Sequence, residues 1–340
     1  MKRRNVSIDV TKGLLTVGMV FAHVVQLLGT DSSLLKRLVL LLNLVSFSGF
    51  FFCFGFAAWG AYLSKPKIPW ANVLRTAFKC YFAFLLSGIA YAVLIGGRTF
   101  NVNEVSQITL LREIPGYSEF LLSFWLMIPL GCLAAPLIRR ATDSPRSLLA
   151  VIALCLAVTL LPSRSTHDPL VGLLIGGSGT PYFPVISYLP LFLIGVFLSR
   201  SEDKFKSSWV FIGIGGTLLF LILTALRVPI SRFPPSPLWI LGSIALVFVY
   251  YGAGRAIARF PQNPVTHYLN LVGNNVLFYL LLSNLALFVL KPRYGLTSPD
   301  LKQTLTIYGI LMVSLYFIQS VVVDSSRANE ALDAGRGVRE

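Results

Sequence analysis

Ten long apolar segments follow one another along this chain of 340 residues, and they constrain the fold more than any other feature. A helix needs about 20 apolar residues to cross the hydrocarbon core of a bilayer. Only 13% of the residues are charged, about half of what ordinary soluble domains carry. The sequence therefore predicts an all-α, polytopic integral membrane bundle of about ten transmembrane helices. The expected spans cover residues 11–29, 38–63, 72–96, 118–138, 147–162, 183–199, 208–226, 236–256, 268–290 and 303–323.

The fifth and sixth of these segments are short. Four prolines surround them, which predicts broken or partly re-entrant helices there, as membranes tolerate where protein or water satisfies the backbone. The loops between spans are too short to fold alone. We therefore expect one transmembrane domain over residues 1–325 and a polar cytoplasmic tail over residues 326–340. The prolines are Pro162, Pro181, Pro184 and Pro190.

The chain carries 29 Lys and Arg against 14 Asp and Glu, a formal net charge of +15. In a membrane protein such an excess indicates cytoplasmic loops that face anionic lipid, and we expect no nucleic-acid partner. With the N-terminus inside, 17 of the basic residues fall in cytoplasmic segments and ten in outer loops. This bias predicts that both termini are cytoplasmic.

The four cysteines all lie inside apolar stretches, so the sequence offers neither a disulfide framework nor a CxxC metal motif. We interpret them as packing residues and expect no metal cofactor. They are Cys53, Cys80, Cys132 and Cys155.

The first apolar segment contains three groups that hydrocarbon does not accommodate cheaply. It reads SIDVTKGLLTVGMVFAHVVQ, with Asp9 and Lys12 at its mouth and His23 deep inside. Eleven residues turn a helix 20° past three full turns, so Lys12 and His23 share one face and are about 16 Å apart along the axis. Intramembrane ionisable groups are costly and usually functional. This face is expected to point into the bundle.

Two interpretations of this face remain open on the residues alone. In the first, His23 acts on a substrate, because imidazole titrates near neutral pH and can serve as a general base. In the second, Asp9 and Lys12 form an interfacial ion pair, and His23 is a core side chain that hydrogen-bonds a neighbouring helix.

The same residues carry a family resemblance. An Asp, a basic residue followed directly by Gly, and a His eleven positions after the basic residue resemble the first helix of the membrane-embedded acyltransferase 3 family. The family more often has Arg where this chain has Lys12. The stretch LVSFSGFFFCFGFAAWG resembles the family's second helix, with Gly55 retained and Phe54 at the position of the usual serine.

Three later stretches, over residues 181–200, 232–249 and 271–287, are similar to segments of this family and of related transmembrane N-acetyltransferases. The last has the Gly-x-Asn pattern that leads into a tyrosine-bearing helix. Some members carry a histidine near position 283, where this chain has Ser283. The combined resemblance covers about 310 residues in segment order and helix count.

The resemblance implies an enzyme that moves an acyl group, usually acetyl, from cytosolic acetyl-CoA to a hydroxyl of an extracytoplasmic glycan or lipid-linked sugar. It places such a protein in a bacterial inner membrane. His23, Lys12 and Asp9 are then the expected catalytic residues. Lys12, Arg75 and Lys79 are the expected partners of the coenzyme A phosphates, although Arg75 and Lys79 are equally well explained as cytoplasmic surface charge.

A tetrahedral intermediate would also need hydrogen-bond donors. The ninth segment offers four such side chains, which could equally hold helices together. These are Asn274, Asn275, Ser283 and Asn284. In the outer loops, His167 and the charged stretch from Glu104 to Glu119 could contact a sugar or be ordinary loop residues. His267 is expected at the inner boundary.

Three alternative functions remain. A secondary transporter or flippase is favoured by proline-interrupted helices and intramembrane polar residues, although the two halves of the sequence show no repeat. A member that binds a partner without catalysis is suggested by Phe54 and Ser283. An N-acetyltransferase that acts on an amino sugar is a third alternative.

Overall fold

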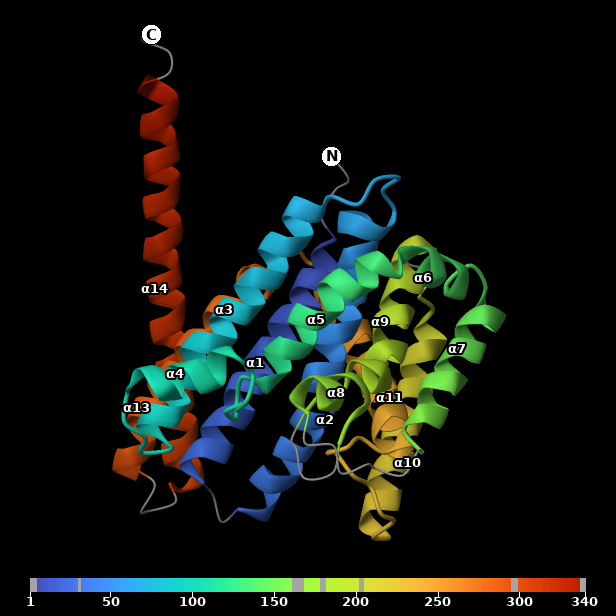
Figure 1. Ribbon diagram of the computed structural model, residues 1–340, viewed down its shortest axis with the longest axis horizontal. Helices are drawn as coiled ribbons and strands as arrows, with labels where there is room; N and C mark the ends of the chain where they lie inside the picture. Colours follow the sequence, from blue (N-terminus) through green and yellow to red (C-terminus); the bar gives the residue numbers. More distant parts are fainter. Residues whose placement is uncertain are drawn as a thin grey trace.

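The computed structural model describes residues 5–29, 32–160, 168–177, 182–201, 205–294 and 299–336. Its described part is all-α, as expected, and forms one bundle (Figure 1). The helices are α1 (Val6–Leu28), α2 (Ser33–Ala58, continued by a π-helical turn, Trp59–Leu63), α3 (Trp70–Leu94), α4 (Val102–Thr109), α5 (Glu119–Leu133), α6 (Ala135–Ala141), α7 (Pro145–Val158), α8 (Pro169–Ile175), α9 (Val185–Arg200), α10 (Ser207–Ala225), α11 (Pro237–Ile257), α12 (Pro264–Asn274), α13 (Val276–Tyr294) and α14 (Leu301–Arg336).

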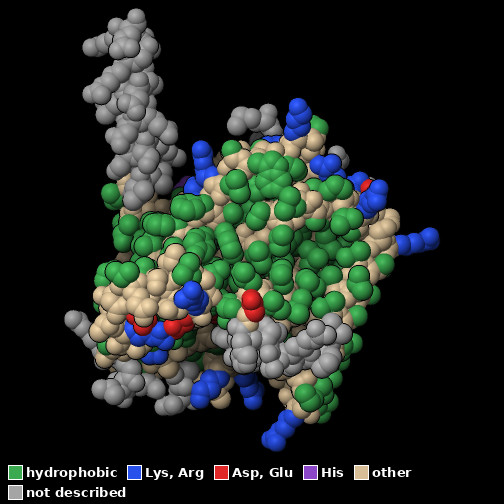
Figure 2. All heavy atoms as spheres, in the orientation of Figure 1, with side chains coloured by type: hydrophobic (Ala, Val, Ile, Leu, Met, Phe, Trp, Pro, Cys, Tyr) green, Lys and Arg blue, Asp and Glu red, His purple; other side chains and the backbone are tan. Residues whose placement is uncertain are grey.

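The burial pattern is that of a protein in a lipid bilayer. Large apolar side chains are exposed along the outer helices, such as Phe211 on α10 at 73% and Phe317 on α14 at 62%. Figure 2 shows a broad hydrophobic band across one face, with Lys and Arg side chains mainly at the two ends of the bundle. Water would penalise so large an apolar surface, whereas lipid tails match it.

The structure does not confirm a count of ten spans. Within the described residues, six helices are long and apolar enough to cross a membrane, and up to eight spans result if each bent helix pair counts as one. The two remaining apolar helices, α7 and α9, have 14 and 16 residues, which reach only about 21 and 24 Å. The expectation of ten spans is not confirmed.

The two sharp bends between described helices lie away from the four prolines, of which Pro184 precedes α9 as its N-cap. The axes of α5 and α6 differ by 85°, and those of α12 and α13 by 81°. Pro136, at the start of α6, has no N–H to continue α5. Asn275, between α12 and α13, leaves the helical region with φ −126° and ψ 35°. Pro190 lies inside α9 without ending it, while Pro162 and Pro181 lie outside the described residues.

The expected polar tail is helical as far as the structure describes it, since α14 continues without interruption to Arg336. In Figure 1 it extends beyond the bundle on the end where α1 begins. The apolar part of α14, Leu301–Val321, is the candidate span.

Helix α1 is the central element. It packs against α2, α11, α12, α13 and α14, and 78% of its most apolar window is buried, against 11% for α10. A polar side chain on α1 therefore meets protein in almost every direction.

Two pairs of glycines let backbones touch around this centre. A Cβ on Gly273 of α12 would lie 1.8 Å from the carbonyl oxygen of Asp9, and one on Gly13 of α1 would lie 2.1 Å from that of Leu269. Where α2 crosses α9, a Cβ on Gly55 would lie 2.0 Å from the carbonyl oxygen of Phe192, and one on Gly195 would lie 2.1 Å from that of Phe52. Only glycine permits these approaches, and they set the positions of α1 and α2.

We predict that Gly273→Ala and Gly55→Ala each destabilise the protein by about 1 to 3 kcal/mol, because the helices must separate to admit the methyl group. Thermal unfolding in detergent measures this. Gly215→Ala on α10 is the matched control, since nothing lies within 4 Å of its Cβ position, and its midpoint should stay near wild type. Equal midpoints for all three variants would contradict the close packing.

Candidate functional site

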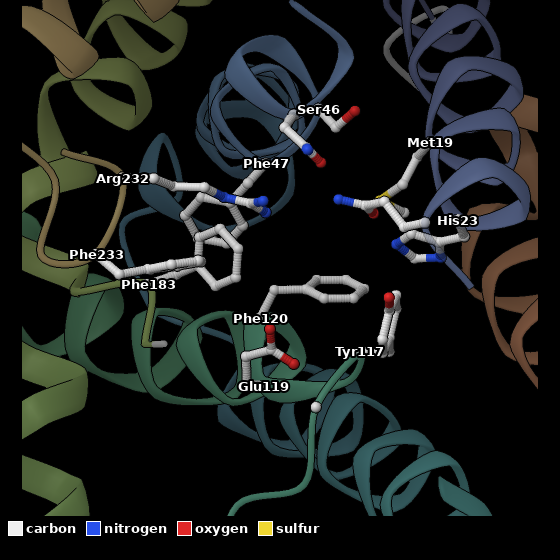
Figure 3. A pocket seen from close by; sticks show the side chains of 13 residues that line it. Met19, His23, Ser46, Phe47, Tyr117, Glu119, Phe120, Phe183, Arg232 and Phe233 are labelled. Atoms are coloured by element: carbon white, nitrogen blue, oxygen red, sulfur yellow. The ribbon is translucent and has the colours of Figure 1, made fainter. Parts of the chain in front are cut away.

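A cavity of about 260 Å³ lies beside the C-terminal part of α1, where Met19, His23 and Gln26 line it. Its walls come from α1, α2, the start of α5 and the loops that precede α5, α9 and α11 (Figure 3). Four phenylalanines line it: Phe47, Phe120, Phe183 and Phe233. The polar side chains that line it are those of His23, Gln26, Asn43, Ser46, Tyr117, Glu119 and Arg232.

The His23 imidazole is held by a short chain of hydrogen bonds. Its Nδ1 lies 2.7 Å from Oδ1 of Asn284 on α13, and Nδ2 of Asn284 donates to the backbone carbonyl of Tyr117 at 3.0 Å. The Tyr117 ring packs edge-on against the imidazole, with centroids 5.3 Å apart. Three segments far apart in sequence thus fix one ring.

This chain determines where the proton on His23 sits. The carbonyl of Tyr117 can only accept, so the amide nitrogen of Asn284 must face it and the amide oxygen must face His23. The oxygen in turn accepts only from a protonated Nδ1. The neutral ring therefore carries its hydrogen on Nδ1, and Nε2 keeps its lone pair. The structure gives Nε2 no hydrogen-bond partner among the described residues, and the ring lines the cavity (Figure 3).

Two charged side chains share the cavity with His23. Arg232, in the loop between α10 and α11, points inward from the opposite wall, and Glu119 lies at the first turn of α5 (Figure 3). The Nε of Arg232 and the Oε2 of Glu119 are buried without a hydrogen-bond partner, and the described residues contain no ion pair between the two within 4.0 Å. Burial lowers the pKa of Arg232, but a guanidinium stays charged at any physiological pH.

Two amides add hydrogen-bonding capacity. Gln26, one turn beyond His23 on α1, and Asn43 on α2 both line the cavity, and neither side chain bonds to another described residue. Burial raises the pKa of Tyr117 to about 12, so its hydroxyl stays protonated and can donate. The cavity therefore presents several unused polar groups between aromatic walls.

Of the expected outer-loop residues, only part reaches the cavity. Glu104 and Glu113 both form ion pairs with Arg98 and brace the loop around α4. Tyr117 and Glu119 line the cavity instead. His167 lies outside the described residues.

Asp9 and Lys12 lie about three to four turns before His23 on the same helix, as the spacing predicts. Lys12 Nζ is 2.6 Å from Asp9 Oδ1, and the side chains are 22% and 5% exposed. They pack beside α12, where Gly13 and Gly273 bring the two backbones together. The ion pair therefore lies near the start of α1, and His23 lies near its end.

Arg75 and Lys79 are not brought to that pair. Both are exposed on α3, among the exposed apolar side chains of Leu74, Phe78 and Phe82. Helix α3 packs against α4, α5 and α13. Of these three helices, α1 packs against α13. Arg75 and Lys79 therefore face outward from the bundle.

The four polar residues of the ninth segment are separated as well. Asn274 is exposed at the end of α12, Asn275 donates to the carbonyl of Leu271 at 3.0 Å, and Ser283 donates to that of Leu280 at 3.1 Å. Only Asn284 reaches the cavity wall, through His23. His267 is exposed on α12.

Sequence reasoning missed Arg232 as a site residue. The available signal was an arginine beside Phe233 and two prolines inside an otherwise apolar stretch. Glu119 gave a similar signal, as an acid that opens an apolar helix. Neither signal says which other residues the side chain meets.

Comparisons with protein-family models, with curated proteins and with solved structures found no match for this chain.

We predict that Asn284→Leu lowers the free energy of unfolding by about 1 to 3 kcal/mol, because it strands Nδ1 of His23 and the carbonyl of Tyr117 without partners. Ser283→Ala is the control, since this buried neighbour bonds only within its own helix. Thermal unfolding of the two purified variants measures the difference. If Ser283→Ala costs as much as Asn284→Leu, the hydrogen-bond chain does not have the role assigned to it.

Proposed function

We propose that this protein is a membrane-embedded acyltransferase that moves an acetyl group from cytosolic acetyl-CoA to a hydroxyl of an extracytoplasmic glycan or lipid-linked sugar. The observation that carries the proposal is His23, whose Nδ1 is held by Asn284 and whose Nε2 has no hydrogen-bond partner among the described residues, at a cavity with unused polar groups. The resemblance of its first helix to the acyltransferase 3 family supports the same reaction.

In the proposed reaction, Nε2 of His23 takes the proton of the acceptor hydroxyl as its oxygen attacks the thioester carbonyl. The tetrahedral intermediate then collapses with cleavage of the carbon–sulfur bond, and the proton on Nε2 passes to the departing thiolate. The products are the ester and coenzyme A, and His23 returns to its starting state. Asn284 keeps Nδ1 protonated throughout and stabilises the imidazolium that forms.

The cavity suits an acceptor with one sugar ring. Its volume of about 260 Å³ is just below the roughly 300 to 1,000 Å³ of clefts for drug-sized ligands. The four phenylalanines offer flat apolar faces for the ring carbons. Gln26, Asn43 and Glu119 offer hydrogen bonds to its hydroxyls.

The acetyl-CoA donor would bind near Lys12, at the start of α1. The phosphates of coenzyme A favour a cationic partner, and Asp9 orients Lys12 by its short ion pair. Arg75 and Lys79 lie apart from this pair, so we assign them at most an outer contact with the donor.

The proposed orientation places both termini in the cytoplasm of a bacterial inner membrane. The 17 to 10 distribution of Lys and Arg supports it. The cavity would then open on the extracytoplasmic side, where a glycan is available.

A transporter or flippase is the second candidate, because two bent helix pairs, α5–α6 and α12–α13, interrupt the bundle as they do in many transporters. Catalysis needs a hydroxyl or amine acceptor and a thioester, whereas transport needs neither. An acetyl-transfer assay therefore separates the two.

We predict that His23→Gln reduces acetyl transfer by roughly 100-fold or more, since glutamine retains hydrogen bonding but cannot accept the proton. Membrane vesicles with radiolabelled acetyl-CoA and a panel of glycans measure the rate, and thermal unfolding checks that the variant is folded. His267→Gln, which changes an exposed histidine on α12, is the matched control and should retain full activity. Transfer by folded His23→Gln protein within a few-fold of wild type would exclude the catalytic role.

A further inference from the structure

Arg232 holds five N–H donors at the cavity, and the described residues accept from none of them. Its guanidinium carbon instead lies 4.7 Å from the Phe233 ring centroid and 5.4 Å from that of Phe183, beside two rings that pack edge to face with centroids 5.2 Å apart. Such cation–π contacts help to hold the guanidinium and use none of its N–H donors.

Other arginines of the bundle are used differently. Arg98 pairs with Glu104 and Glu113, Arg200 pairs with Asp143, and Arg139 donates to the carbonyls of Leu63 and Lys65, at 2.8 Å each. These three hold loops or helix ends together. Arg232 contacts the rings of Phe183 and Phe233 but donates no side-chain hydrogen bond to the described residues, so its N–H donors are not used in holding the fold together.

An enclosed charge without a partner is expensive, and the cost falls sharply when an opposite charge with good geometry arrives. Glu119 is the acid of the cavity, yet it forms no ion pair with Arg232 within 4.0 Å. The planar fork of arginine matches the two oxygens of a carboxylate or a phosphate. The guanidinium therefore has the form of an oxyanion receptor.

The receptor lies on the wall that faces His23 (Figure 3). A ligand held at Arg232 by an acidic substituent would extend its ring across the four phenylalanines, with its hydroxyls near Nε2 of His23 and the carboxylate of Glu119. This arrangement would present one hydroxyl to the base reproducibly.

We propose that Arg232 binds an oxyanion on the acceptor, either a uronic acid carboxylate or a sugar phosphate, so that the substrate of this site is an acidic saccharide. This inference rests on the proposed function and adds the substrate class to it. Arg232 is in this account a binding residue for the acceptor and takes no part in proton transfer.

The test is equilibrium binding to the purified full-length protein in detergent, without acetyl-CoA. Three probes are compared: methyl β-glucuronide, glucose 1-phosphate and the neutral methyl β-glucoside. The variants are Arg232→Gln and Arg232→Lys, with Arg227→Gln as the matched control, because Arg227 is an exposed arginine of the same loop.

We expect at least one acidic probe to bind the wild-type protein tenfold or more tightly than the neutral probe. The comparison of the two acidic probes then shows which oxyanion the site prefers. Arg232→Gln should remove that advantage, Arg232→Lys should retain part of it, and Arg227→Gln should leave it unchanged. If Arg232→Gln does not fold, the wild-type comparison of acidic with neutral probes still decides.

The inference is overturned if the neutral probe binds as tightly as both acids, or if Arg232→Gln keeps the preference within twofold.

A transfer assay with the same probes separates this result from the proposed function. Acetylation of the neutral sugar alone would overturn the acidic acceptor and leave the acyltransferase standing. If the acidic probes bind in an Arg232-dependent way but no probe is acetylated, the result counts against the acyltransferase. It then also counts against the acidic probes as acetyl acceptors. An effect of Arg232→Gln on acetyl-CoA binding alone would assign the oxyanion to the donor and also overturn the inference.

Discussion

The scarcity of water inside a membrane bundle is the constraint on which this structure depends. A buried polar group without a partner costs free energy there, so polar side chains usually pair within the protein. The chain from His23 through Asn284 to the carbonyl of Tyr117 satisfies three such groups at once. By doing so it leaves one lone pair, on Nε2, unsatisfied at a defined place. The candidate site combines this lone pair of His23 with the unpaired groups of Glu119 and Arg232.

Close backbone contacts make this arrangement possible. Gly13 and Gly273 seat α12 against the first half of α1, and the sharp bend after Asn274 redirects the chain into α13. Helix α13 then runs along α1, and Asn284 reaches His23. A bulkier residue at either glycine would shift α13 and with it the tautomer of the histidine.

The sequence was informative where the signal is local. Apolar length predicted the all-α membrane bundle, and helical periodicity placed Asp9, Lys12 and His23 on one central helix. It was less informative about the bends, because Pro190 is accommodated within α9 while Asn275 ends α12. The spacing could not reveal that Asn284 rather than Ser283 or Asn275 meets His23, since that choice depends on the relative rotation of α1 and α13. Arg232 escaped for the same reason, because it lies in a loop that only the packed bundle brings to the cavity. Glu119 was expected as a loop residue that could contact a sugar, but the sequence did not place it near His23.

The tautomer of His23 is the most direct test of this account. Nitrogen-15 NMR of the full-length protein, labelled selectively at histidine in a lipid environment and assigned by the loss of one signal in His23→Gln, reports the protonation of each ring nitrogen. The account predicts a neutral His23 with its hydrogen on Nδ1 and an unprotonated Nε2, and predicts that Asn284→Leu disturbs this state. A hydrogen on Nε2, or a tautomer that does not respond to Asn284→Leu, would contradict the proposed origin of the base.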